Sequence, residues 1–125
     1  MNYKCLIAKS DKDSENSWLP LWMHLRDTAG IMQKLVRKWI PRSTVNATRL
    51  DAESFEQTAI FLAAIHDIGK ATSYFQAIIS QRIPHKFDDI NNSGYELHDS
   101  HQYLYAVKTH HPYAGEWILR DYLKV

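Results

Sequence analysis

The pair His66-Asp67 directly follows an apolar run, residues 60–65, and is followed by Gly69 and Lys70. A hydrophobic segment therefore places an imidazole and a carboxylate side by side. A carboxylate is costly to bury unless a positive group compensates it. A divalent metal is one such group, because imidazole nitrogen suits transition metals and a carboxylate can bridge two of them. In this setting the pair indicates a candidate metal site.

Two further histidines could complete that site. His24 lies at the edge of the apolar stripe of a predicted first helix, where a half-packed boundary histidine is the plain alternative. His111 precedes Pro112 and is therefore predicted to be the N-cap of the last helix, where the helix dipole favours the neutral, metal-binding imidazole. His66 and Asp67 are predicted to lie on or near the inward face of the second helix. Together these residues indicate a hydrolytic centre with one or two metals.

Lys70 follows the predicted end of the second helix. A cation beside a metal is unfavourable unless an anion also binds, so its functional interpretation is a clamp on a substrate phosphate. The alternative is a solvated lysine after a helix end. Three other histidines, His85, His98 and His101, are interpreted as surface residues.

The composition describes one soluble domain. The 125 residues are 45% hydrophobic and 23% charged, with a net charge of +1, which argues against a broad surface for nucleic acid. Cys5 is the single cysteine, so neither an internal disulfide nor a thiolate zinc cluster is available. The chain has no apolar stretch near the ~20 residues of a membrane span and no secretory signal at its start. We therefore expect a cytoplasmic protein without a membrane partner.

Helical spacing dominates the first half of the chain. Residues 3–8 are predicted as an extended lead-in or a short strand, and residues 10–17 as a loop. A helix is predicted over residues 21–40 and is ended by Pro41, with a loop over residues 42–50. Asp51 is expected to cap a second helix, and Gly69 to end it in a left-handed conformation. The inward stripe of that helix is predicted to contain Phe55, Ala59, Leu62 and His66.

The second half also favours helices, so the predicted class is all-α. Ser73 and Gln76 resemble a capping box, which predicts a helix from residue 73 to about residue 81. Residues 82–94 are predicted as a long loop, and residues 98–107 as a helix. The last helix is expected from Pro112, with small residues that allow another helix to approach closely. Its predicted stripe and small positions are Ala114, Gly115, Ile118, Leu119 and Tyr122.

These residues resemble a known family. The segment His-Asp-Ile-Gly-Lys-Ala-Thr over residues 66–72, followed by Phe-Gln at 75–76 and by His111-x-x-Ala-Gly, is similar to the HD superfamily of metal-dependent phosphohydrolases. The similarity is closer to the HD nuclease domain of the CRISPR-associated helicase-nuclease of type I systems. It covers nearly the whole chain and is weakest over residues 82–97.

The resemblance implies an HD helical bundle and a nuclease that cuts single-stranded DNA once an RNA-guided surveillance complex has opened the target. By position, His24, His66 and Asp67 match the ligands of one metal, and Asp67 and His111 match those of a second. Lys70 matches the residue that contacts the scissile phosphate, so Asp67 and Lys70 are the implied catalytic residues. The implied cofactors are one or two divalent ions, among manganese, iron, cobalt, nickel and magnesium.

The family's domain continues with a His-His pair, a further Asp and then a helicase, none of which lies within residues 1–125. The chain is therefore expected to be the N-terminal portion of an HD nuclease domain, with the helicase in the same or a separate chain. Self-association is a further expectation if the chain is naturally this short. Two alternatives stay open: a phosphohydrolase of small nucleotides, and a catalytically incomplete interaction module derived from such an enzyme.

Overall fold

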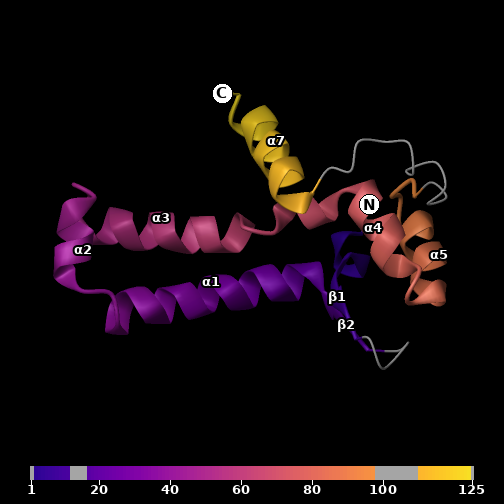
Figure 1. Ribbon diagram of the computed structural model, residues 1–125, viewed down its shortest axis with the longest axis horizontal. Coiled ribbons are helices and arrows are strands. Elements are labelled where there is room, and N and C mark those ends of the chain that lie inside the picture. The colour runs from indigo at the N-terminus through magenta and orange to yellow at the C-terminus, as the bar shows by residue number, and fades with distance from the viewer. Residues whose placement is uncertain (1, 12–16, 98–109, 125) are drawn as a thin grey trace. The chain divides into compact units, whose positions relative to one another are not determined.

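The structure is a computed structural model that describes residues 2–11, 17–97 and 110–124. These residues are mostly helical, which confirms the predicted all-α class (Figure 1). They add one small antiparallel sheet, whose first strand overlaps the end of the segment predicted as an extended lead-in or a short strand, residues 3–8. In chain order the elements are η1 (Tyr3–Cys5), β1 (Ile7–Ser10), β2 (Trp18–Pro20), α1 (Leu21–Lys38), α2 (Arg42–Ala47), α3 (Ala52–Ile65), η2 (Ile68–Ala71), α4 (Ser73–Ser80), α5 (Pro84–Asn92) and α7 (His111–Leu123).

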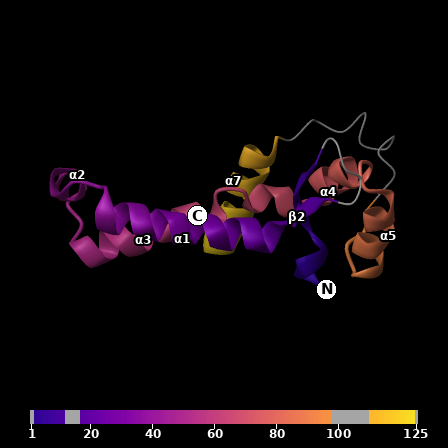
Figure 2. The same ribbon diagram turned by 90° about the horizontal axis from the view of Figure 1, so that it is seen from below.

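The chain divides into two compact units. The first unit comprises the described residues up to His24 and those from Asp67 onwards, and the second unit is Leu25–His66. The second unit is a helical hairpin in which α2 joins α1 to α3, and α3 runs beside α1 (Figures 1 and 2). Arg37 on α1 donates to Glu56 on α3 at 2.8 Å, and this hydrogen bond lowers the pKa of the Glu56 carboxyl.

The loop predicted over residues 42–50 is wrong, because α2 occupies its first six residues. Pro41 is the N-cap, and its carbonyl accepts from the Thr44 amide at 3.0 Å. Thr48 closes the other end by donating its hydroxyl to the Val45 carbonyl at 2.7 Å. Polar side chains that are typical of loops therefore accompany a single short helix here.

α3 begins as predicted but does not bury the predicted face. Asp51 is the N-cap and accepts from the amide and the hydroxyl of Ser54 at 2.9 and 2.6 Å, and these hydrogen bonds lower its pKa. However, Leu62 is 58% exposed and His66 is also exposed, while the buried residue of α3 is Ala63. The inward orientation predicted for His66 is therefore wrong. The covered face of α3 is centred on Ala63, which lies 100° around the helix from Leu62.

In the first unit, the β1–β2 hairpin determines where α1 begins. Ile7 pairs with Pro20 and Ser10 with Trp18, with an irregularity between Ile7 and Lys9. The β1 strand and the residue before it contribute buried apolar side chains, and the amide of Leu21 donates to the carbonyl of Leu6 at 2.8 Å. The first turn of α1 is thus attached to the hairpin.

The predicted helix after residue 73 is confirmed as α4, but the predicted capping box is wrong. Thr72 is the N-cap, and its hydroxyl accepts from the amide of Phe75 at 3.4 Å. Gln76 does not reach back to the helix start. Its side chain is buried and bonds to Ile7 and Lys70 instead.

The loop predicted over residues 82–94 is also wrong, because α5 fills most of it. Its proline lies in the first turn, where a missing N–H costs nothing, and Gly94 follows the helix with a φ of 96°. Ile83 and Ile90 are fully buried at its two ends. Lys86 forms an ion pair with the exposed Asp89 at 2.8 Å, which lowers the Asp89 pKa.

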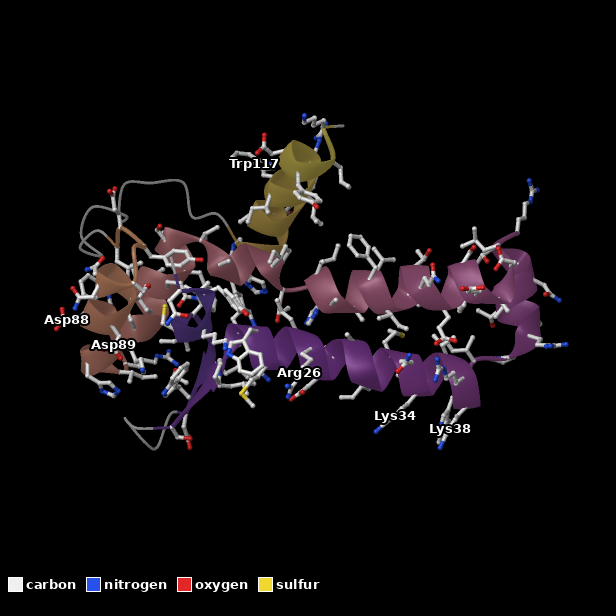
Figure 3. The ribbon with its side chains drawn as sticks, turned by 180° about the vertical axis from the view of Figure 1, so that it is seen from behind. Arg26, Lys34, Lys38, Asp88, Asp89 and Trp117 are labelled. Carbon is white, nitrogen blue, oxygen red and sulfur yellow. The ribbon has the colours of Figure 1, made fainter. Side chains whose placement is uncertain are left out.

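α7 begins one residue earlier than predicted, with His110 as the N-cap and His111 in the first turn. Ala114 and Gly115 are buried, as their small size indicated. The later part of the predicted stripe is more open, since Tyr122 is 79% exposed, and Trp117 also projects from the helix (Figure 3).

The helix predicted over residues 98–107, with His98 and His101, lies outside the described residues. His85 is exposed, as expected of a surface histidine. Within the described ranges no helix is both long and apolar enough to span a membrane.

Candidate metal centre

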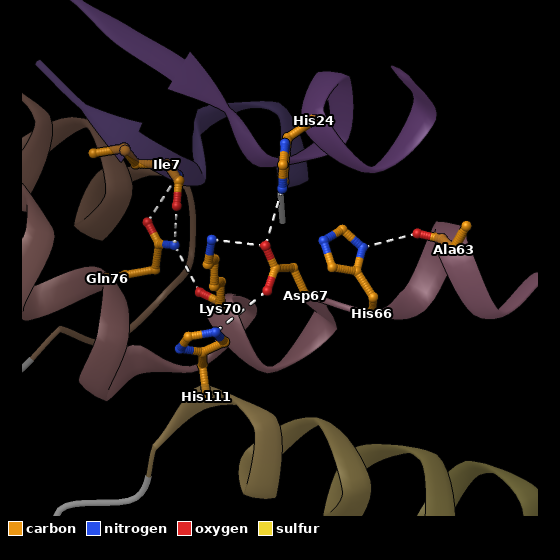
Figure 4. Close-up of polar contacts among 8 residues, drawn as sticks. All are labelled: Ile7, His24, Ala63, His66, Asp67, Lys70, Gln76 and His111. Carbon is orange, nitrogen blue, oxygen red and sulfur yellow. Dashed lines mark hydrogen bonds and ion pairs between the residues drawn. The ribbon is translucent and has the colours of Figure 1, made fainter. Parts of the chain in front are cut away.

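The carboxylate of Asp67 is the centre of a buried polar cluster in the first unit. Its side chain is 11% exposed, and three basic side chains face it (Figure 4). His24 Nε2 lies 2.9 Å from Oδ2, and Lys70 Nζ lies 2.7 Å from the same oxygen. His111 Nε2 lies 3.3 Å from Oδ1. The first unit therefore brings together the four candidate residues that it contains, and both carboxylate oxygens are engaged.

Local backbone structure places His24, Asp67 and Lys70. His24 lies in the first turn of α1, whose start is held by the Leu21–Leu6 hydrogen bond. Asp67 is the N-cap of η2, and its carbonyl accepts from the amide of Lys70 at 2.9 Å. This tight turn directs the Lys70 side chain back onto the Asp67 carboxylate, three residues earlier in the chain.

His111 reaches Asp67 because α7 packs closely on η2. A Cβ on Gly69 would overlap the carbonyl oxygen of His111 and lie 2.6 Å from the amide nitrogen of Gly115. Gly69 is thus required by the approach of another backbone. The predicted left-handed conformation is wrong, since Gly69 lies within η2 and Gly94 is the described glycine with positive φ. Phe75 packs its ring edge against the His111 imidazole, with ring centroids 5.9 Å apart.

His66 belongs to the second unit and is joined to Asp67 by the peptide bond. Its Nδ1 lies 2.8 Å from the carbonyl of Ala63 (Figure 4). Because a carbonyl oxygen only accepts, Nδ1 carries the proton and the neutral ring has its lone pair on Nε2. A backbone carbonyl on one imidazole nitrogen is the usual outer-shell partner of a histidine that binds metal through the other.

The Lys70–Asp67 ion pair is buried, which makes the loss of either partner costly. Lys70 is 8% exposed, so the solvated lysine considered from the sequence is wrong. Its ammonium also lies 5.7 Å from the centroid of the Phe75 ring. Removing one partner of such a pair leaves an uncompensated buried charge, which is far more costly than the loss of a surface pair.

The donor set suits a divalent transition metal. Imidazole nitrogens from α1 and α7 face opposite oxygens of one buried carboxylate, and divalent transition metals accept nitrogen-and-oxygen sets of this kind. His24, Asp67 and His111 are the residues of the first unit that would hold such an ion.

Sequence reasoning missed the supporting roles of Phe75 and Gln76. Phe75 lines the cluster, and Gln76 binds the backbone of Lys70. The available signal was their place in the Phe-Gln motif directly after His-Asp-Ile-Gly-Lys-Ala-Thr. Because Gln76 was interpreted as part of a helix cap, its hydrogen bond to the Lys70 backbone was not predicted.

The helical fold and the His-Asp pair define the class of HD proteins. The family model described as "Cas3, HD domain" matches residues 8–125, so the chain belongs to the Cas3 HD domain family. The resemblance inferred from the motifs is thus confirmed, and with it a CRISPR-associated family of HD hydrolases and nucleases.

Among curated proteins, the CRISPR-associated nuclease/helicase Cas3 of Streptococcus thermophilus is 30% identical to this chain over 126 residues. The match covers 91% of this chain but 14% of that relative, so the chain spans about one-seventh of its length. No solved structure matches the chain.

Proposed function

We propose that this chain carries the metal-binding part of a nuclease domain that hydrolyses phosphodiester bonds of single-stranded DNA in type I CRISPR defence. The observation that carries the proposal is the buried Asp67 carboxylate, which imidazoles from α1 and α7 face on opposite oxygens. Membership of the Cas3 HD domain family supports nuclease chemistry. The choice of DNA as substrate is consistent with the nuclease/helicase name of the Streptococcus relative.

In this proposal His24, His66 and Asp67 bind one divalent ion, and Asp67 and His111 bind a second. The engagement of both Asp67 oxygens supports a bridging role for this carboxylate. The Nδ1–H bond of His66 to Ala63 supports ligation through Nε2. When bound, the metal would lower the pKa of a water molecule that it holds and would supply positive charge for the phosphoryl group.

The protein's own groups then bind and orient the substrate. Asp67 is the anchor of the centre, and Lys70 is the cation beside it that would contact the scissile phosphate. Phe75 limits water on one side of His111 and Lys70. Manganese, iron, cobalt, nickel and magnesium are the candidate ions, with one or two bound.

The proposed partners follow from the family. They are single-stranded DNA, an RNA-guided surveillance complex that opens the target, and a helicase in the same or a separate chain. The proposed location is the cytoplasm, where such a complex would meet its target.

One observation favours an alternative, a metal-free interaction module derived from an HD enzyme. The Lys70 ammonium at 2.7 Å already neutralises the buried carboxylate, so the cluster has its own positive charge. A phosphohydrolase of small nucleotides has no such support, and it would leave the match to the Cas3 HD domain model unexplained.

Metal content and cleavage test the proposal together. Equilibrium dialysis with elemental analysis is expected to find one or two divalent ions per chain, and manganese to support cutting of a labelled single-stranded oligonucleotide. Asp67→Ala is expected to abolish both, whereas Asp121→Ala, an exposed carboxylate on α7, retains both.

Cleavage that survives Asp67→Ala would exclude the assigned site. A wild-type chain without stoichiometric metal would overturn the metal centre and favour the interaction module. Cleavage of free nucleotides with intact single-stranded DNA would favour the small-nucleotide alternative.

A further inference from the structure

Gln76 forms a fully bonded amide at the interior of the first unit. Its side chain is 0% exposed and comes from α4 (Figure 4). Oε1 accepts from the amide of Ile7 at 2.9 Å, while Nε2 donates to the Ile7 carbonyl at 2.9 Å and to the Lys70 carbonyl at 2.7 Å. One side chain thus satisfies three backbone groups from two distant segments.

The chemistry of the carboxamide explains why glutamine occupies this position. Ile7 is 0% exposed, so its peptide N–H and C=O need partners inside the protein. A peptide group has one acceptor oxygen and one donor hydrogen. The side-chain carboxamide of glutamine has the same acceptor and two donor hydrogens. Gln76 therefore pairs with Ile7 as a neighbouring strand would, and its second hydrogen remains for Lys70.

The two ends of this connection lead to the two sides of the metal centre. On one side Ile7 follows Leu6, whose carbonyl holds the amide of Leu21 at the start of α1, the helix that carries His24. On the other side Lys70 bonds to Asp67 through both its amide and its ammonium. The Gln76 amide is therefore a direct tie between the segment that leads to His24 and the segment that contains Asp67.

We infer that Gln76 is a positioning residue of the metal centre, which fixes Lys70 and Asp67 relative to the start of α1. The inference rests on the proposed function, because it concerns the same ligands. Binding constellations require their groups to be held to about 0.5 Å. Loss of a group that orients a ligand from outside the metal shell costs roughly 10–100-fold in metal affinity.

The test compares manganese affinity in variants of the full 125-residue chain, measured by calorimetric titration. Gln76→Met keeps the side-chain volume and removes all three hydrogen bonds, and we expect its dissociation constant to rise about 10–100-fold. Ser80→Ala is the matched control. Ser80 is also 0% exposed on α4, but its hydroxyl bonds to Ala77 within the helix, so its affinity should stay near the wild-type value.

The outcomes separate this inference from the proposed function. A wild-type chain that binds no manganese contradicts the proposed function. Suppose that the wild type binds manganese. If folded Gln76→Met then binds manganese equally well, or if Ser80→Ala loses as much affinity as Gln76→Met, the positioning role is overturned and the proposed function is not. Circular dichroism establishes folding. If Gln76→Met is unfolded, Gln76→Asn replaces it in the test, because it keeps the carboxamide on a side chain one methylene shorter. Gln76→Asn is then expected to bind manganese more weakly than the wild type and Ser80→Ala.

Hydrogen exchange in the wild type is a second test of the positioning role of Gln76. If Gln76 couples the Ile7 backbone to the centre, saturating manganese should slow hydrogen exchange at the Ile7 amide more than at the amide of Ile90. Ile90 is equally buried but lies in α5. Equal slowing at the two amides would overturn the inference.

Discussion

At the scale of single residues, the buried ammonium of Lys70 is the least expected feature of the site. It shares Oδ2 of Asp67 with His24, at 2.7 and 2.9 Å respectively. A cation this close to a carboxylate neutralises the buried charge but also competes with any metal for the same oxygen. The structural role of Lys70 and its proposed phosphate contact therefore involve the same ammonium group.

Lys70→Met should lower the free energy of unfolding by about 2–4 kcal/mol when a chelator is present, because the Asp67 carboxylate stays buried. Saturating manganese should restore more stability to this variant than it adds to the wild type. Urea unfolding with chelator and with manganese measures both effects. Lys86→Met is the matched control, since Lys86 forms the same i,i+3 pair with an exposed partner, Asp89. An unchanged stability of Lys70→Met in chelator would contradict the prediction.

At the scale of elements, the contact between η2 and α7 determines the position of His111. Gly69 and Gly115 allow the two backbones to meet, and the first turn of α7 then places His111 Nε2 3.3 Å from Asp67. A side chain at Gly69 would force α7 away from η2. The geometry of the second proposed metal position therefore depends on an element contact as much as on its ligands.

Gly69→Ala should destabilise the protein by roughly 1–3 kcal/mol, because the added methyl group overpacks the contact with His111 and Gly115. Its manganese affinity should fall as well. Gly30→Ala is the matched control. No atom lies within 4 Å of a Cβ built on Gly30, which is in the interior of α1, so we expect stabilisation by about 0.5–1 kcal/mol. Thermal unfolding distinguishes the two variants, and destabilisation of equal size in both would refute the argument from close approach.

At the scale of the whole molecule, three carboxylates have lowered pKa values through specific hydrogen bonds. Ser54 lowers the pKa of Asp51, Arg37 that of Glu56, and Lys86 that of Asp89. A carboxyl with a lower pKa in the folded state contributes stability above its unfolded pKa. That contribution is lost as the pH falls through the folded value. The three groups belong to both units, so the whole chain should lose stability in acid.

We expect the wild type to lose stability progressively as the pH falls below the unfolded values of 3.8 and 4.5. The triple variant Asp51→Asn, Glu56→Gln, Asp89→Asn should be less stable at neutral pH and lose less on acidification. Denaturant unfolding between pH 7 and pH 3 measures the difference. A control triple with the same change of charge measures the effect of net charge: Glu53→Gln, Glu116→Gln and Asp121→Asn. Parallel pH profiles for wild type and the first triple would contradict the assignment.

Local chemistry made several features predictable from the amino-acid sequence. The period of the apolar residues predicted α1. Asp51 predicted the start of α3, which begins at the next residue, and Ser73 predicted the start of α4, of which it is the first residue. The residue types at the centre were also readable, because imidazole and carboxylate in a hydrophobic context require a compensating cation. The helices over residues 42–47 and 84–92 were missed, since their Pro, Ser and Asn residues serve helix ends as readily as loops.

The tertiary structure decided which groups meet. That His24, Lys70 and His111 converge on Asp67 depends on the hairpin that holds α1 and on the close approach of α7 to η2. The exposure of His66, the burial of Lys70 and the three bonds of Gln76 have no signature in periodicity, because each follows from contacts between segments far apart in the chain. Sequence spacing specifies the chemical groups and their helices, whereas burial and distance arise only when those helices pack.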